Sequence, residues 1–192
     1  MQMYQLFDSR PPLRMALFLG ITGISMLAGA FISFSIVCAI LQIPFSSIQN
    51  ILLQPKFATM AQLANALASI IAFGLPSVLL AFFVKGNWIH NMGFRPIKSY
   101  PSIVVVILLA LTGLVLSGAL GSVTEKIPIP AHFKNWAISL EAQYKKAMIS
   151  MTHMSSLKDL FFTLTAVAII PAIVEEVYFR GTLQKILLDW TG

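Results

Sequence analysis

Two adjacent carboxylates and an arginine lie close together near the C-terminal end of the chain. In the stretch IIPAIVEEVYFRG, residues 169–181, Arg180 follows four positions after the second member of the pair Glu175 and Glu176. Residues four apart share one face of a helix, so Glu176 and Arg180 can form an ion pair. Glu175 is turned about 100° away around the helix and has no obvious partner in the segment. Such a carboxylate can act as a general base toward water.

These charges follow an apolar run, Leu160 to Val174, and need an explanation. A charge at the middle of a membrane helix costs roughly 2.5–3.5 kcal/mol on insertion scales. Pro171 cannot donate a hydrogen bond to the carbonyl of Val167, so we expect it to kink the helix and open space beside the glutamates. Three interpretations stay open: catalysis, an acidic relay for protons or ions, and ordinary anchoring at a helix end, with Lys185 as a second anchor.

The composition is that of a membrane protein. Hydrophobic residues make up 57% of the 192 residues and charged residues only 10%, against about 25% charged residues in an average soluble domain. Too few charges remain to cover a soluble surface, so the bilayer is the expected solvent. The net charge of +6 comes from basic residues scattered in short polar gaps. That distribution is typical of positive-inside anchoring and does not indicate a nucleic-acid partner.

Four apolar segments predict the fold. The first three are long enough to span a bilayer, which takes about 20 helical residues, whereas the fourth is long enough only if its helix continues through Glu175, Glu176 and Arg180. No run alternates with period two, so helices are expected rather than strands. We predict an all-α, polytopic transmembrane helical bundle that forms a single membrane domain over residues 1–192. The predicted spans are residues 15–41, 61–84, 102–120 and 160–181.

The connection over residues 121–159 contains a predicted amphipathic helix. Trp136, Leu140, Tyr144 and Met148 recur every four residues, with charged residues beside them. Such a helix can lie on the membrane surface or pack on the bundle, and the pattern does not distinguish the two.

The basic residues also predict an orientation. The connection between the second and third spans carries Lys85, Arg95 and Lys98 and no acidic residue, which favours the cytoplasmic side. The N-terminus is then cytoplasmic as well. We therefore expect a multi-pass protein of the inner (plasma) membrane whose fourth helix runs inward, with the glutamates in its cytoplasmic half.

The motif around the glutamates resembles that of a known family. Residues 175–181, Glu-Glu-Val-Tyr-Phe-Arg-Gly, are similar to the first motif, Glu-Glu-x-x-x-Arg, of the CPBP intramembrane proteases. This family comprises the CAAX prenyl endopeptidases and the bacteriocin-processing (Abi) proteins. The preceding apolar run with its proline, and residues 92–96 (Met-Gly-Phe-Arg-Pro), also resemble bacterial members.

The resemblance implies hydrolysis of peptide bonds within the membrane. It assigns the role of general base to Glu175, and it implies that Glu176 and Arg180 orient and charge-balance that base. The family also uses a histidine from a Phe-x-x-x-His motif and, from a third motif, a histidine with an asparagine or aspartate. It implies a peptide or membrane-protein substrate and lipid as the surrounding partner. It leaves open whether a full-length protein also uses a divalent metal such as zinc, because metal dependence has been argued both ways for the family.

The later motifs of the family have no counterpart in this sequence. His90, His132 and His153 do not have the neighbours that those motifs require. We therefore expect the chain to be the N-terminal part of a longer protein, catalytically incomplete and without a cofactor of its own. Two alternatives remain: a non-catalytic membrane protein, such as a bacteriocin-immunity factor or a scaffold, and a fragment of a transporter with an acidic relay.

Overall fold

A computed structural model describes residues 11–83, 100–152 and 154–191. The described residues contain helices and no strand, which confirms the predicted all-α class. Four helices are long and apolar enough to cross a membrane, as predicted. They cover Pro11–Leu41, Pro55–Phe82, Ile103–Thr124 and Leu157–Thr191.

Contacts within the chain divide it into two units, the first comprising Met1–Phe94 with Lys145–Gly192 and the second Arg95–Tyr144. The first unit contains three of the four membrane-spanning helices and the glutamates. Its helices are α2 (Pro11–Leu41), α3 (Ile48–Leu52), α4 (Ala58–Ser69), α5 (Leu75–Phe83), α9 (Leu157–Thr163), α10 (Ile170–Glu176) and α11 (Gln184–Thr191), with the last residues of α8 (Lys134–Met151) and the short 3₁₀ turns η1 (Phe45–Ser47) and η2 (Pro55–Phe57).

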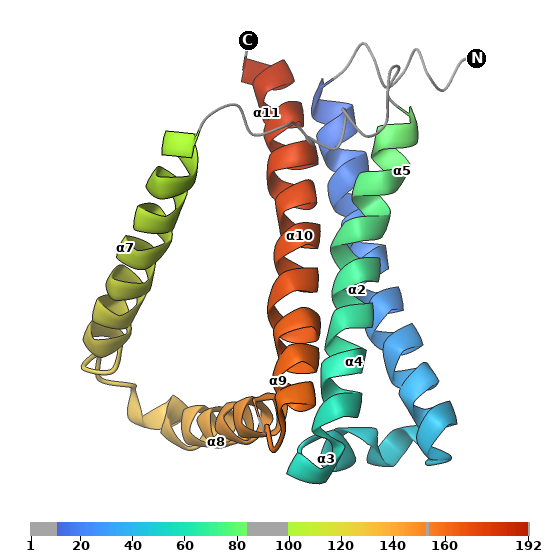
Figure 1. Ribbon diagram of the computed structural model, residues 1–192, viewed down its shortest axis with the longest axis vertical. Helices are drawn as coiled ribbons and strands as arrows, with labels where there is room; N and C mark the ends of the chain where they lie inside the picture. The colour runs from blue at the N-terminus through green and yellow to red at the C-terminus, as the bar shows by residue number, and fades with distance from the viewer. Residues whose placement is uncertain (1–10, 84–99, 153, 192) are drawn as a thin grey trace. The chain divides into compact units, whose positions relative to one another are not determined.

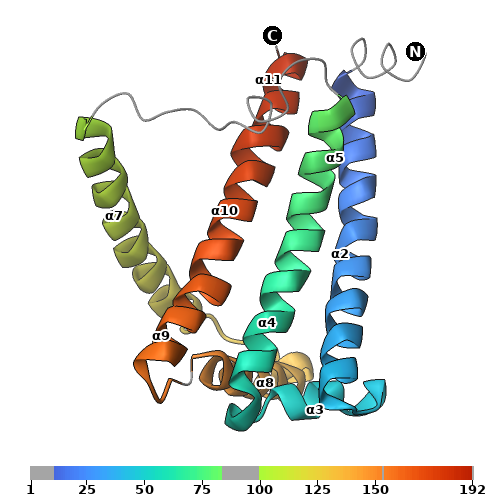
Figure 2. The ribbon, with the colours of Figure 1, turned by 45° about the vertical axis from the view of Figure 1, so that its right-hand side comes forward.

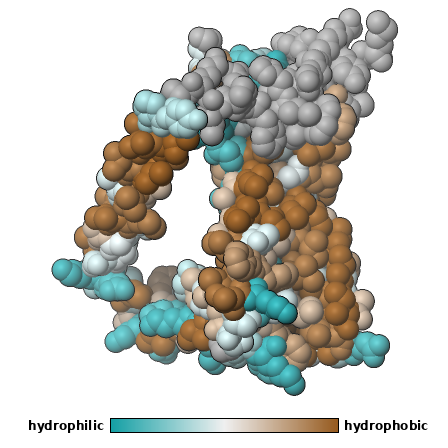
Figure 3. Space-filling view, in the orientation of Figure 1, coloured by the Kyte–Doolittle hydropathy of each residue, from teal (hydrophilic) through white to brown (hydrophobic). Residues whose placement is uncertain are grey.

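Three long helices of the first unit run side by side (Figures 1 and 2). Helix α2 is one, α4 and α5 form the second, and α9 to α11 form the third. Arg14 at the start of α2 contacts Asp189 at the end of α11, so the fourth span ends where the first begins, as the predicted topology requires. Apolar side chains cover much of the sides of this bundle (Figure 3), as expected of surfaces that face lipid.

Small residues bring α2 close to its neighbour. The buried residues of α2 recur every three or four positions and include Thr22, Ser25, Gly29 and Ser33. A Cβ atom added at Gly29 would lie 3.0 Å from the carbonyl oxygen of Ala68 and 3.2 Å from the Cβ of Ile71. Only glycine permits this approach, which is the means by which membrane helices gain packing contacts without a hydrophobic driving force.

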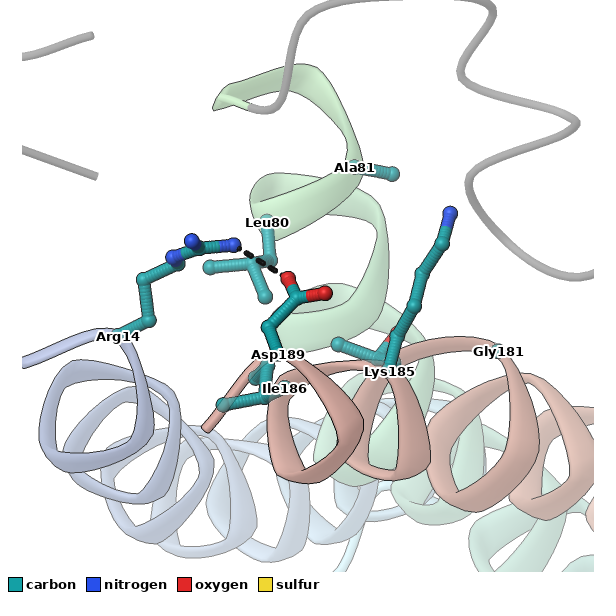
Figure 4. Close-up of a pocket in the computed structure, with 8 residues that line it drawn as sticks. Arg14, Leu80, Ala81, Gly181, Lys185, Ile186 and Asp189 are labelled. Atoms are coloured by element: carbon teal, nitrogen blue, oxygen red, sulfur yellow. Dashed lines mark hydrogen bonds and ion pairs between the residues drawn. The ribbon is translucent and has the colours of Figure 1, made fainter. Parts of the chain in front are cut away.

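Buried polar side chains connect the helices at the end of the unit that lies away from the Arg14–Asp189 contact (Figure 4). The Gln62 amide donates hydrogen bonds to the carbonyl of Met151 at 2.6 Å and to Oγ1 of Thr163 at 2.8 Å. Ser150 Oγ, also buried, donates to the carbonyl of Leu52 at 2.8 Å. These bonds tie α4, α9 and the end of α8 together because an unsatisfied polar group in an apolar interior is costly.

Wider, π-helical turns interrupt the second and fourth spans. They are η3 (Ile70–Gly74), η5 (Leu164–Ile169) and η6 (Val177–Leu183). Each is followed by an N–H that bonds five residues back: Leu75 to Ile70, Ile170 to Thr165 and Gln184 to Phe179.

Two of these turns directly precede prolines. Segment η3 comes before Pro76 in α5, and η5 comes before Pro171 in α10. A proline has no N–H to donate, and its ring crowds the preceding turn. The hydrogen-bond register of the fourth span changes just before Pro171, and the span continues past it as one helix. The kink expected at Pro171 stays a prediction.

The fourth span is longer than predicted. It was expected over residues 160–181, but it runs from Leu157 to Thr191. At its start, Ser156 caps the helix by accepting a hydrogen bond from the N–H of Asp159. At its end, residues 182–191 continue the same helix, so Glu176 lies 15 residues before the last helical residue (176 to 191).

The second unit contains α7 (Tyr100–Thr124), η4 (Ala131–Phe133) and the first part of α8. Helix α7 is the third predicted span, extended by a few residues at each end. Helix α8 confirms the helix predicted within residues 121–159. Its apolar stripe, Trp136, Leu140, Tyr144 and Met148, is exposed.

Candidate functional site

The three predicted site residues lie within six consecutive positions of one long helix. Glu175 and Glu176 are the last residues of α10, and Arg180 lies in η6. All three side chains are exposed. The predicted ion pair is confirmed, because Nη1 of Arg180 contacts Oε1 of Glu176. The charges of Glu176 and Arg180 therefore neutralise each other in the structure.

Glu175 is different from its neighbour. Within the part of the chain that the structure describes, no hydrogen bond or ion pair is found for its carboxylate. After Glu176 and Arg180 neutralise each other, Glu175 carries the net negative charge of the site. Its carboxylate is accessible from outside the first unit.

The site lies well inside the fourth span. From Glu176 the helix continues to Thr191, which is about 22 Å at 1.5 Å per residue. The predicted end at residue 181 would have placed the charges at a helix end, where anchoring at the membrane surface explains them easily. In the observed helix the three charges are therefore not at a helix end.

Tyr178 is a residue of the motif that sequence reasoning did not single out. Its side chain is 5% exposed, and its hydroxyl donates a hydrogen bond to Oγ1 of Thr22 on α2 at 3.2 Å. Thr22 in turn donates to the carbonyl of Phe18 at 2.7 Å. This chain of bonds connects the fourth span to the first at the level of the site.

Aromatic packing holds Tyr178 in place. Its ring stacks on Phe18 with centroids 4.7 Å apart and meets Phe73 edge to face at 5.1 Å. Two residues correspond to about 200° of helix rotation, so a buried Tyr178 turns Glu176 and Arg180 to the opposite, outer face. The spacing within the motif indicates that Tyr178 and the ion pair lie on opposite faces, because Tyr178 is two residues from each member of the pair.

A wide turn surrounds Arg180. In η6, Thr182 Oγ1 donates to the carbonyl of Val177, five residues back, at 3.2 Å. Gly181 and Thr182 are buried in this turn, while Arg180 is exposed. Single π-helical turns inside α-helices are rare and occur frequently at functional sites, because they rotate the following side chains relative to a regular helix.

The described residues do not form a metal centre. No group of three or more His, Cys, Asp or Glu side chains lies close enough together in residues 11–83, 100–152 and 154–191 to hold a metal ion. Glu176 is already engaged by Arg180. The described residues around Glu175 therefore do not by themselves supply the ligands of a zinc ion.

Among the residues that the structure describes, no histidine belongs to the first unit, which carries the glutamates. His132 lies in η4, in the second unit. His90 and His153 lie outside the described residues, as do residues 92–96, which resemble the cytoplasmic segment of bacterial CPBP proteins.

Comparisons of the chain with models of protein families, with curated proteins and with solved structures found no match. The resemblance to the CPBP proteases therefore depends on the motif residues alone. The arrangement of Glu175, the Glu176–Arg180 pair and Tyr178 is the structural basis for a functional proposal.

Proposed function

We propose that this chain is the glutamate-bearing part of a CPBP-type intramembrane endopeptidase, in which Glu175 activates water. The observation that carries the proposal is the difference between the two glutamates. Glu176 is neutralised by Arg180, whereas Glu175 is exposed and has no hydrogen-bond or ion-pair partner among the described residues. A charge of this kind inside a membrane span is a functional-site hypothesis by default.

The proposed chemistry is hydrolysis of a peptide bond. Glu175 takes a proton from a water molecule as the oxygen of that water adds to the carbonyl carbon of the substrate. The carbon–nitrogen bond then breaks, and the proton passes to the leaving nitrogen. The products are a carboxylate and an amine. Glu176 and Arg180 keep the local charge at −1, so that Glu175 is the group that exchanges the proton.

Apolar side chains beside the site support an apolar substrate. Ile173 and Phe179 are 52% and 51% exposed, and Phe179 follows Glu175 by one helical turn. A hydrophobic peptide or a membrane-protein segment can pack on these side chains next to the carboxylate. In the proposal the protein spans the inner membrane with its N-terminus in the cytoplasm, and lipid surrounds the bundle.

The proposed reaction needs catalytic groups besides the glutamates and Arg180. The resemblance assigns the remaining steps to histidines, and the histidines of this sequence do not have the spacing of those motifs. The proposal therefore requires further groups that stabilise the oxyanion. For this reason the activity is to be measured on the natural protein in a membrane.

The decisive experiment is cleavage of apolar peptides by that protein in liposomes, in water labelled with oxygen-18. Mass spectrometry should detect the label in the new carboxylate of the products. Glu175→Gln should abolish cleavage, whereas Glu125→Gln, which changes an exposed glutamate after α7, should leave the rate unchanged.

Three outcomes would count against the proposal. Cleavage at the normal rate by Glu175→Gln would remove the role of Glu175. Peptide binding without cleavage by the wild type would favour a scaffold or immunity protein. Proton-coupled flux that requires Glu175 would favour a transporter.

A further inference from the structure

Helix α8 has one apolar side that the chain leaves uncovered. Its stripe, Trp136, Leu140, Tyr144 and Met148, is 62%, 44%, 66% and 43% exposed. An apolar stripe on a helix is stabilising only when another apolar surface covers it. The sequence pattern allows two partners for this stripe, the bundle and the membrane surface. The role inferred for it below is independent of the proposed protease activity.

The last residues of α8 contact the first unit through another side of the helix. Ser150, which is buried, donates from Oγ to the carbonyl of Leu52 at 2.8 Å. Lys146 lines a pocket together with Asn50 of α3. Met148 is two residues from both Lys146 and Ser150, and two residues correspond to about 200° of helix rotation. The stripe is therefore turned away from the side of α8 that packs on the bundle.

The position of α8 in the chain brings it to the boundary of the membrane. Its last residue, Met151, accepts a hydrogen bond from Gln62 in the second span, which begins at Pro55. The fourth span begins at Leu157, six residues after α8 ends (151 to 157), and the third span ends ten residues before α8 begins (124 to 134). A helix attached in this way lies beside lipid headgroups.

The composition of α8 fits the surface of a membrane and not its interior. Its 18 residues contain four charged side chains, and it is not one of the four helices apolar enough to span a bilayer. Trp136 and Tyr144 suit the interface because each ring is apolar and carries one polar group that can meet headgroups or water. Amphipathic helices of this kind insert their apolar side about 5–10 Å into the boundary between headgroups and acyl chains.

We propose that α8 is an interfacial helix whose stripe inserts into one leaflet of the bilayer. Lipid is favoured over a second copy of the chain as the partner, because membrane spans flank α8 on both sides in the sequence and lipid is present whatever the oligomeric state. The connection between the third and fourth spans then follows the membrane surface. The opposite side of α8, with Ile138 and Ala142, faces water.

Spin labels on single cysteines test this arrangement. Leu140→Cys and Tyr144→Cys place labels on the stripe, and Ile138→Cys and Ala142→Cys are matched controls, because both lie two residues from Leu140 and all four positions are exposed. The lone cysteine is replaced in every variant by Cys38→Ser. The full chain is placed in liposomes of phosphatidylcholine and phosphatidylglycerol, and electron paramagnetic resonance compares collisions with oxygen, which concentrates among acyl chains, and with a nickel complex, which stays in water.

The ratio of oxygen to nickel collisions should be several-fold higher at Leu140 and Tyr144 than at Ile138 and Ala142. Equal ratios at the four positions, with free access of the nickel complex, would place the stripe in water and overturn the proposal. Exclusion of both reagents from the two stripe positions would also overturn it, because the stripe would then be covered by protein, either the bundle or a second copy.

A measurement on the wild type keeps the proposal testable if a variant does not fold. Phosphatidylcholine with a diazirine at the headgroup end of an acyl chain is added to the same liposomes and activated by light. Mass spectrometry should then find several-fold more lipid adduct on Leu140 than on Ile138, a residue of the same size in the same helix. Equal labelling of the two residues would contradict insertion of the stripe.

Discussion

Tyr178 donates a hydrogen bond to Thr22 across the bundle, with 3.2 Å between the two oxygens. In the chain, Tyr178 lies between Glu176 and Arg180. Its burial fixes the rotation of the helix and therefore the direction in which these two side chains point. With this ring against α2, the Glu176–Arg180 pair lies on the outer face of the fourth span. A packing contact on one side of the helix therefore decides where the charges on the other side point.

Replacing Tyr178 with phenylalanine tests this connection. The variant keeps the ring stacking on Phe18 and loses the hydrogen bond to Thr22. We expect a loss of about 0.6 kcal/mol, the average for hydrogen bonds between membrane helices. Thermal unfolding in detergent measures it, with Tyr144→Phe, at an exposed position, as the control. If Thr22→Val added its full effect to that of Tyr178→Phe, the two hydroxyls would not be coupled.

Substitutions of glycine in α2 should have different effects on stability at two positions. Gly29→Ala places a methyl group against the backbone of Ala68 and the Cβ of Ile71, neither of which can rotate away, and should destabilise the bundle by about 1–3 kcal/mol. Gly23→Ala meets no atom within 4 Å and should be neutral or slightly stabilising. Thermal unfolding of both variants checks this, and equal effects would contradict the close approach of the helices.

The buried amide of Gln62 should contribute to stability. Gln62→Leu removes its two hydrogen bonds and leaves the carbonyl of Met151 without this donor, at a cost of about 1–3 kcal/mol. Gln49→Leu, at an exposed position in α3, is the control. Chemical unfolding in mixed micelles measures the difference. In Gln62→Leu, an added Thr163→Val should have little further effect, and full additivity would argue against the shared hydrogen bond.

The Glu176–Arg180 pair should be needed for charge balance rather than for folding of the bundle. Glu176→Gln or Arg180→Gln leaves one charge without its partner inside a membrane span, which costs at most roughly 2.5–3.5 kcal/mol at the centre of a helix. Each single variant should therefore lower the membrane-inserted fraction, measured by alkaline extraction. The double variant should restore it, and a further decrease would show that the two charges are not paired.

The membrane character and the pairing in the motif were predictable from the sequence. Long apolar runs imply helices because each satisfies its own backbone hydrogen bonds in lipid. The spacing of Glu176 and Arg180 predicted their ion pair because residues four apart share a helix face. The ends of the fourth span were less predictable. Its last ten residues contain Lys185 and Asp189, so their composition does not distinguish a continuing helix from a polar tail.

Sequence by itself determined that this is a helical membrane protein and that one helix carries an acidic pair and an arginine. Those features depend on local composition and on the geometry of a single helix. Only the tertiary structure decided that Tyr178 packs on Phe18 and Thr22, and that Arg14 contacts Asp189. Such contacts join residues more than 150 positions apart. They depend on how three helices pack together, and no periodicity within one helix contains that information.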